Sequence, residues 1–79
     1  MNGNLINDVE YLNGMLHGKW IDYYFSGNIS SITIYEFDKK EGLSIYYYEN
    51  GYKKSETLYE NNLQIKNTKR WNQKGDILR

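Results

Sequence analysis

Residues 51–62 read Gly51-Tyr52-Lys53-Lys54-Ser55-Glu56-Thr57-Leu58-Tyr59-Glu60-Asn61-Asn62. This stretch opens on a glycine, places a tyrosine near its end and closes on two residues that favour turns, and its glycine and tyrosine recur at a spacing of 24. The repeated positions are Gly3, Gly27, Gly51 and Gly75, then Tyr11, Tyr35 and Tyr59, then Tyr23, Tyr47 and Trp71. A fixed period in this range marks a repeat architecture. The sequence therefore predicts a single repeat domain over 1–79, with units at 3–26, 27–50 and 51–74 and a partial unit at 75–79.

Each unit contains two runs whose side chains alternate with a period of two, which is typical of a β-strand. The predicted strands are 5–12, 19–25, 29–37, 43–49, 53–60 and 65–72, followed by a C-terminal stub at 76–78. Tyrosine and β-branched residues favour strands, and the chain lacks alanine, the best helix former. We expect no helix.

Turn signals fall between the runs. Asn50-Gly51 predicts a type I′ hairpin, since Asn and Gly both tolerate positive φ. The other predicted turns are Ser26-Gly27 and Lys74-Gly75 at the same phase, and Asn13-Gly14, Asp38-Lys39 and Asn61-Asn62 at the other end of the strands. Connections this short join antiparallel neighbours. The predicted fold class is all-β: an antiparallel meander of β-hairpin repeats, about six strands plus the stub, in a single curved or twisted sheet.

The chain is small for a self-sufficient core. A domain of this size buries roughly 60% of the surface that its unfolded chain exposes. It has no cysteine and one histidine, which excludes disulfides and a His-rich metal site, and we expect no cofactor. A lone sheet has two open edges and an uncovered face. We therefore expect a homo-oligomer that forms through an open sheet edge or an aromatic face.

Charge and hydropathy narrow the partner classes. Ten basic residues balance ten acidic ones, whereas nucleic-acid binding normally needs a basic excess. No apolar run approaches the roughly 20 residues that cross a membrane. The first residues do not resemble a signal peptide, so we expect a cytoplasmic protein. The partial fourth unit leaves open whether the sequence is an excerpt of a longer repeat protein.

The stretch 51–62 resembles the first half of the MORN-type repeat found in bacterial YwqK-like antitoxin proteins. The second half is best matched by Gly18-Lys19-Trp20-Ile21-Asp22-Tyr23-Tyr24 and by residues 42–51. The resemblance covers nearly the whole chain and implies a meander of β-hairpins that neutralises a partner toxin by protein–protein contact. The family's tryptophan is present as Trp20 but is replaced by Ser44 and Thr68, and the glycine of Gly18 and Gly42 becomes Lys66. The third repeat is therefore degenerate, as terminal capping repeats often are.

Candidate site residues are aromatic. Six repeat positions, Tyr11, Tyr35, Tyr59, Tyr23, Tyr47 and Trp71, are expected to stack between neighbouring strands as the core, because cross-strand aromatic pairs stabilise sheets. A second set, Trp20, Tyr24, Tyr46 and Tyr48, is expected on the opposite face. Exposed Trp and Tyr favour a binding surface. This second set is the candidate face for a protein partner or for self-association.

The histidine and the paired basic residues give only weak signals for catalysis or nucleic-acid binding. His17 stands beside Gly18 at a predicted strand start with no nucleophile motif nearby, which favours a surface turn residue over a catalytic one. The pairs Lys39-Lys40, Lys53-Lys54 and Lys69-Arg70 lie between aromatic positions, a pattern found on single-strand nucleic-acid surfaces, but lysines also protect exposed strand edges. We expect no catalytic or metal residues.

Together these patterns predict a non-enzymatic protein-binding repeat module, an antitoxin or immunity protein that neutralises a toxin by direct contact. The alternative is a structural or membrane-associated MORN scaffold module. Nucleic acid is a disfavoured partner, and a membrane surface is a second choice.

Overall fold

The computed structural model describes residues 6–79, so Gly3 and Leu5, where the first unit and the first strand are predicted to begin, lie outside the described residues. Strands and turns make up the described part of the chain. The strands are β1 (Asn7–Leu12), β2 (Met15–Tyr23), β3 (Ile29–Glu36), β4 (Lys39–Tyr47), β5 (Lys53–Glu60), β6 (Leu63–Gln64), β7 (Lys69–Trp71) and β8 (Ile77–Leu78).

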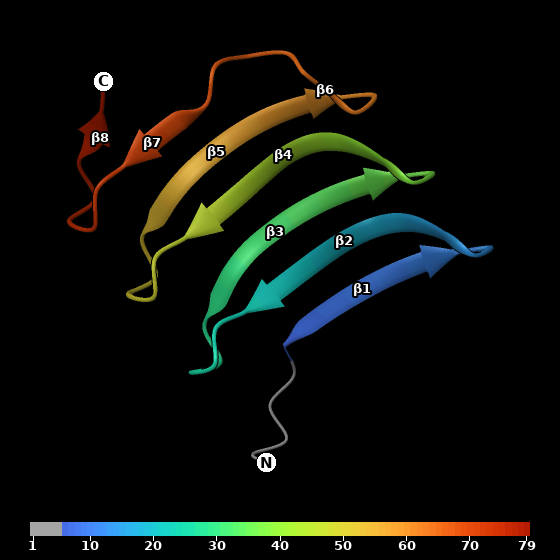
Figure 1. Cartoon of the computed structure of the whole chain (residues 1–79), viewed down its shortest axis with the longest axis horizontal. Helices are drawn as coiled ribbons and strands as arrows, with labels where there is room; N and C mark the ends of the chain where they lie inside the picture. Colours follow the sequence, from blue (N-terminus) through green and yellow to red (C-terminus); the bar gives the residue numbers. More distant parts are fainter. Residues whose placement is uncertain (1–5) are drawn as a thin grey trace.

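All of these strands belong to one antiparallel sheet, in the order β1-β2-β3-β4-β5-β7-β8, with β6 also paired to β5. Each strand lies beside its neighbour in the chain, and the sheet stays open, with β1 at one edge and β8 at the other (Figure 1). The predicted fold class is confirmed: the chain is an antiparallel meander of β-hairpins in a single twisted sheet.

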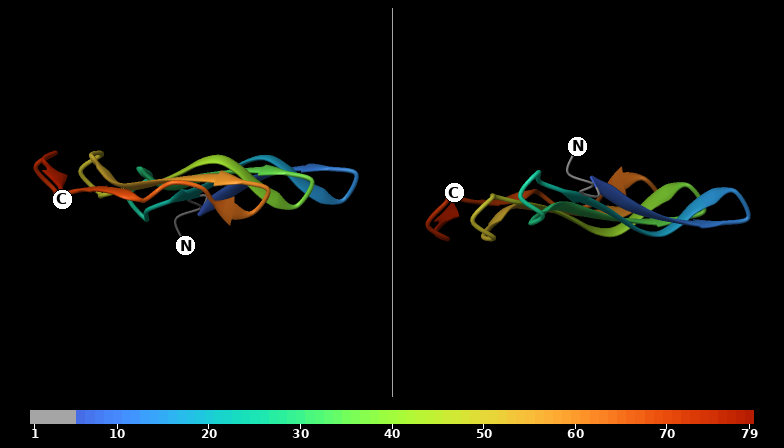
Figure 2. Two further views of the ribbon diagram at one scale, coloured as in Figure 1. Left: turned by 90° about the horizontal axis from the view of Figure 1, so that it is seen from above. Right: turned by 90° about the horizontal axis from the view of Figure 1, so that it is seen from below.

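The sheet is one layer thick. Its extents are 41 × 40 × 11 Å, and the edge-on views in Figure 2 show a thin, twisted slab. Among residues 6–79 no apolar side chain is buried, and the two buried residues are Ser31 and Ser44, at 4% and 5% exposure. Apolar side chains in the middle of the sheet, such as Ile32 and Ile45, are half-buried by their neighbours within the layer. Both faces of the sheet are therefore accessible to a partner.

Three two-residue turns close the hairpins along one side of the sheet. Their central residues all have positive φ, as a type I′ turn requires: Asn13 and Gly14, Phe37 and Asp38, and Asn61 and Asn62. The predicted turn at Asp38-Lys39 is therefore displaced by one residue, because Lys39 already pairs with Glu36 in the ladder. Asp38 tolerates this conformation since its short side chain can hydrogen-bond nearby backbone.

The opposite side of the sheet carries three-residue loops that end on glycine. At the middle loop, Gly51 N–H donates to the Tyr48 carbonyl at 3.0 Å and Tyr48 N–H donates to the Tyr52 carbonyl at 2.8 Å. Within this loop, residues 48–52, only Gly51 has a positive φ, at 95°. The predicted Asn50-Gly51 type I′ turn is therefore wrong: the loop is a tight turn followed by a left-handed glycine. The loops at Gly27 and Gly75 have the same hydrogen bonds.

Strands β2 and β4 begin earlier than predicted because they continue through Gly18 and Gly42. These glycines have φ of 114° and 91°, and the register shifts beside each of them. Bulges of this kind use glycine because a side chain would strain the left-handed backbone. The runs predicted at 19–25 and 43–49 are the second halves of longer strands.

The predicted sixth strand at 65–72 is interrupted. The third copy keeps the register of the second: Tyr59 pairs with Gln64 as Tyr35 pairs with Lys40, and Glu56 pairs with Lys69. Between these pairs the chain leaves the ladder, which separates β6 from β7 (Figure 1). Lys66 stands here at the position of Gly18 and Gly42, and it lacks their positive φ. Loss of the bulge glycine accounts for the break.

Candidate functional site

The ladder register assigns the central side chains to two faces, because residues directly opposite in a pair lie on the same side of a sheet. The hydroxyl face is defined by Trp20, Ser31, Thr33, Ser44, Tyr46 and Thr57. The isoleucine face, on the other side, is defined by Ile21, Ile32, Ile34, Leu43, Ile45 and Leu58.

Small polar side chains form a satisfied ladder on the hydroxyl face. Ser31 Oγ donates to Asp22 Oδ2 at 2.8 Å, and Trp20 Nε1 donates to Asp22 Oδ1 at 3.0 Å. The Thr33 and Ser44 hydroxyls lie 3.2 Å apart. Among the described residues, no buried side-chain polar atom lacks a hydrogen-bond partner. These bonds fix the side chains, so the floor of this face is rigid and presents little unsatisfied polarity.

The same ladder continues into the degenerate third copy. The hydroxyls of Thr57 and Thr68 lie 2.8 Å apart, although the backbone around Thr68 has left the strand. Thr57 also pairs with Ser44 across β4 and β5. The row of hydroxyls therefore spans from β3 to the chain beyond β5.

Aromatic side chains lie on the hydroxyl face beside these small polar side chains. Trp20 and Tyr35 rings lie 6.0 Å apart, and Tyr46 is 50% exposed. Tyr59 is on the same face, since it lies two residues from Thr57 and pairs with Gly42. The Lys40 ammonium sits 4.8 Å from the Tyr59 ring centre, in cation–π geometry. The observed aromatic surface thus consists of Trp20, Tyr35, Tyr46 and Tyr59. Tyr11, 65% exposed, lies on the same face at the β1 edge, two residues beyond Val9, the ladder partner of Trp20.

This arrangement corrects the predicted division of the aromatic residues. Tyr35 and Tyr59 lie on the same face as Trp20 and Tyr46, not opposite them. None of the six repeat aromatics pairs directly with another of the six. Tyr11 pairs with Leu16, Tyr35 with Gly18 and Lys40, and Tyr59 with Gly42 and Gln64. Tyr23 pairs with Ile29, Tyr47 with Lys53, and Trp71 with Ile77. A period of 24 residues spans two strands, so equivalent positions are separated by a strand.

Tyr24 and Tyr48, both predicted to belong to the binding face, lie in the glycine loops beyond the strand ends. The Tyr24 hydroxyl donates to the Tyr47 carbonyl, and the Tyr48 hydroxyl donates to the Trp71 carbonyl at 2.7 Å. Both tyrosines therefore connect one loop to the next. The structure brings Trp20 and Tyr46 onto one face and gives Tyr24 and Tyr48 a structural role.

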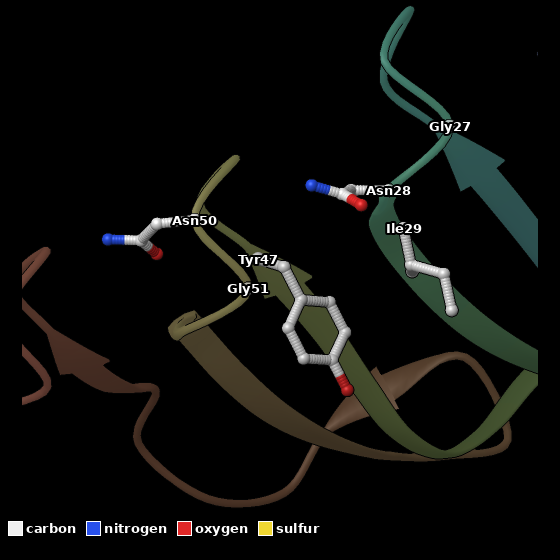
Figure 3. Close-up of a pocket in the computed structure, with 6 residues that line it drawn as sticks. All are labelled: Gly27, Asn28, Ile29, Tyr47, Asn50 and Gly51. Carbon is white, nitrogen blue, oxygen red and sulfur yellow. The ribbon is translucent and has the colours of Figure 1, made fainter.

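Tyr23, Tyr47 and Trp71 lie on the isoleucine side, close to the glycine loops. Tyr47 and Ile29 flank an open hollow of about 480 Å³ between two successive loops, with Gly27, Asn28, Asn50 and Gly51 around its rim (Figure 3). The Asn28 amide donates to the Glu49 carbonyl at 2.8 Å across this gap. The hollow is a consequence of loop spacing, and its rim has no charged side chain.

Two apolar rows define the isoleucine face. Ile21, Ile32 and Ile45 are consecutive cross-strand partners on β2, β3 and β4. Leu43 and Leu58 pair on β4 and β5. The sequence analysis missed these residues as a surface, although isoleucine alternation along each strand contained the signal. In a single layer this side is as accessible as the aromatic one.

A second hollow, of about 150 Å³, opens on this face where the sixth strand is broken. It is lined by Leu43, Glu56, Leu58, Lys66, Asn67 and Lys69. Its lysines come from the irregular segment and from β7, whereas its apolar walls come from β4 and β5. The break thus creates a shallow site with apolar walls, two lysines and one carboxylate, that of Glu56.

His17 lies within β2 and supports a neighbouring turn. Its Nδ1 accepts a hydrogen bond from Phe37 N–H at 3.3 Å, and its ring lies 4.7 Å from the Phe37 ring. Among residues 6–79, no group of three or more His, Asp or Glu side chains is placed to hold a metal ion.

The three basic pairs do not form one stripe. Lys39, Lys53 and Lys69 lie on the isoleucine side, whereas Lys40 and Arg70 lie on the hydroxyl side. Alternation along a strand divides Lys39-Lys40 and Lys69-Arg70 between the two faces, whereas a register shift beside Lys53 interrupts the alternation in the third pair. A continuous phosphate-binding track is therefore not assembled from these pairs.

Comparisons with known proteins give no match, whether to family models, to curated proteins or to solved structures. The similarity to MORN-type repeats stays a prediction from the motif. Nowhere in residues 6–79 is there a helix that is long and apolar enough to cross a membrane.

Proposed function

We propose that this chain is a non-enzymatic β-repeat module of MORN type that binds a protein partner in the cytoplasm, and that it acts as an antitoxin by covering part of a toxin. The observation that carries the proposal is the hydroxyl face, where the half-exposed Tyr46 and the partly buried rings of Trp20, Tyr35 and Tyr59 stand on a hydrogen-bonded polar floor. Trp and Tyr dominate binding hot spots because they bury a large area and lose little conformational entropy.

The mechanism would be steric. Trp20 and Tyr46 offer anchors on β2 and β4, and the buried hydroxyls of Ser31 and Ser44 between them are already hydrogen-bonded. Docking would therefore desolvate few unsatisfied polar groups, which favours affinity. An open, single-layer sheet suits the covering of a partner's surface better than it suits enclosing a small substrate.

The test is co-expression with the products of neighbouring genes, followed by co-purification and titration. We expect a soluble one-to-one complex. Trp20→Ala and Tyr46→Ala should each raise Kd by about 30-fold, since a hot-spot truncation costs about 2 kcal/mol or more. Tyr52→Ala is the matched control, because Tyr52 is 51% exposed but lies in a loop. The Tyr52→Ala variant should bind the partner with an affinity close to that of the unchanged protein.

The alternative function, a membrane-associated scaffold, gives a different result. It predicts sedimentation with vesicles rich in anionic lipid and release at high salt. Such sedimentation, together with failure of every co-expressed neighbour to co-purify, would contradict the antitoxin proposal.

A further inference from the structure

Two cross-strand rows of the isoleucine face share one order of side chains: a carboxylate at the β1 edge, apolar residues in the centre and a lysine beyond β5. The first row runs Asp8, Ile21, Ile32, Ile45, Glu56 and Lys69. The second runs Glu10, Lys19, Ile34, Leu43 and Leu58, and ends at Lys66, which shares a hollow with both leucines. If a row is aligned with a second copy of itself in the reversed order, the carboxylate at each end therefore meets a lysine.

A twofold axis parallel to the strands, midway between β3 and β4, reverses the strand order of one copy relative to another. It places β1 of one copy over β7 of the second, and β3 over β4. Asp8 then faces Lys69 of the second copy, and Ile32 faces Ile45 of the second copy. We propose that two copies of this chain pack their isoleucine faces together about this axis and form a homodimer.

The remaining charges of the two rows, Lys19 and Glu56, would each face an apolar residue of the second copy. Lys19 would face Leu58, and it is exposed, so its long stem can pack on the leucine while the ammonium stays in water. Glu56 would face Ile21 of the second copy, but its carboxylate is already paired with Lys53 at 2.9 Å, and its side chain is 15% exposed. Glu10, whose Oε1 accepts from Lys19 N–H at 2.7 Å, would face Lys66 of the second copy at the hollow left by the strand break. Opposite charges at both ends of each row would also fix the alignment of the two sheets.

The available area is sufficient. The extents of 41 by 40 Å bound an area of about 1,600 Å², so a contact over half of it reaches the roughly 800 Å² per partner of a standard interface. Two sheets packed about 10 Å apart, with strands aligned within about 30°, form the core of a β-sandwich. Dimerisation would therefore give the half-buried isoleucines the second layer that one chain lacks. The inference is independent of the proposed function, because it uses the opposite face and leaves Trp20 and Tyr46 free.

The test is a charge exchange, measured by sedimentation equilibrium over a range of protein concentrations. We expect the unchanged chain to dimerise. Asp8→Lys and Lys69→Asp should each weaken dimerisation by about tenfold or more, since each brings like charges together at two symmetry-related places. The double variant should recover most of the affinity. Only a contact between these two positions in different copies produces this recovery, because one chain holds them at opposite edges of its sheet.

Arg70→Asp is the matched control: it makes a similar charge change on the same strand, but on the hydroxyl face. It should leave dimerisation within about twofold of the unchanged protein, as distant surface charges do. A monomeric mass at every concentration would overturn the proposal. So would a double variant that is as weak as the two single changes combined, or an Arg70→Asp variant that is as weak as Lys69→Asp.

A second measurement does not depend on charge. The chain has no cysteine, so a mixture of Ile32→Cys and Ile45→Cys proteins can be joined by a short bismaleimide. We expect a covalent dimer of the two variants in high yield. A mixture in which Thr33→Cys, on the hydroxyl face, replaces Ile32→Cys should give little product. Equal yields from both mixtures would exclude the proposed alignment.

Discussion

Single polar atoms connect each turn to the turn of the next unit. Tyr24 and Tyr48 donate to carbonyls 23 residues further along the chain. On the other side of the sheet, Asp38 Oδ1 accepts from Leu16 N–H at 2.7 Å and Asn62 Oδ1 accepts from Lys40 N–H at 3.0 Å. The tyrosine bonds join strands that are not ladder partners, whereas the Asp38 and Asn62 bonds connect a turn to the strand beside it. In a sheet without a buried core, they contribute a larger share of the stability than they would in a globular domain.

Tyr48→Phe tests this role at the residue scale. It removes the hydroxyl that donates to the Trp71 carbonyl and keeps the ring, so we expect the free energy of unfolding to fall by about 0.5–1.5 kcal/mol. Urea denaturation monitored by circular dichroism measures the change. Tyr46→Phe is the control, since Tyr46 is half exposed on the hydroxyl face, and it should have little effect. Equal losses in both variants would contradict the role assigned to Tyr48.

Strands are defined by their register and by the bulge that each unit carries. In the first two units, a positive-φ glycine lets a long strand pass the bulge. At Gly18 the Glu10 carboxylate occupies the place that a side chain would take. In the third unit Lys66 occupies this position, and the strand separates into β6 and β7. One residue type thus decides whether an element is continuous.

Lys66→Gly should therefore repair the sixth strand. We expect amide hydrogen exchange of residues 65–68 to slow by about fivefold, because glycine adopts the left-handed backbone at about 1 kcal/mol less cost than lysine. Exchange followed by NMR measures this. Lys66→Ala removes the same charge without easing positive φ and should leave exchange unchanged. If alanine slowed exchange as much as glycine did, charge and not conformation would explain the break.

At the scale of the whole molecule, the strands follow one another in a single row. Each strand forms ladder pairs only with its neighbours, so stability should follow position in the row, as in repeat proteins. Ile32 is flanked by Ile21 and Ile45 in the centre, whereas Ile77 on β8 has one ladder partner, Trp71, and is 48% exposed. The centre is therefore the part that holds the fold together.

Truncation at these two positions should give unequal costs. We expect Ile32→Ala to destabilise the protein by about 1–3 kcal/mol, below the range for fully buried isoleucine because Ile32 is half-buried, and Ile77→Ala to cost less than about 0.5 kcal/mol. Urea unfolding at one fixed protein concentration compares them. A cost for Ile77→Ala that equals the cost for Ile32→Ala would show that stability is not graded from centre to edge.

The sequence by itself determined the meander, its 24-residue period and the approximate turn positions, because glycine, asparagine and strand alternation are local signals. It also indicated the weak third copy through Lys66. Only the tertiary structure decided which aromatic side chains share a face. Tyr23 pairs with Ile29, yet Asp22 pairs with Ser31, so a bulge at Ser30 changes the side on which the following residues lie. Strict alternation from Ile29 to Tyr35 therefore puts Tyr35 on the wrong face. The roles of Tyr24 and Tyr48 likewise depend on carbonyls 23 residues away, a contact that only the packing of successive loops creates.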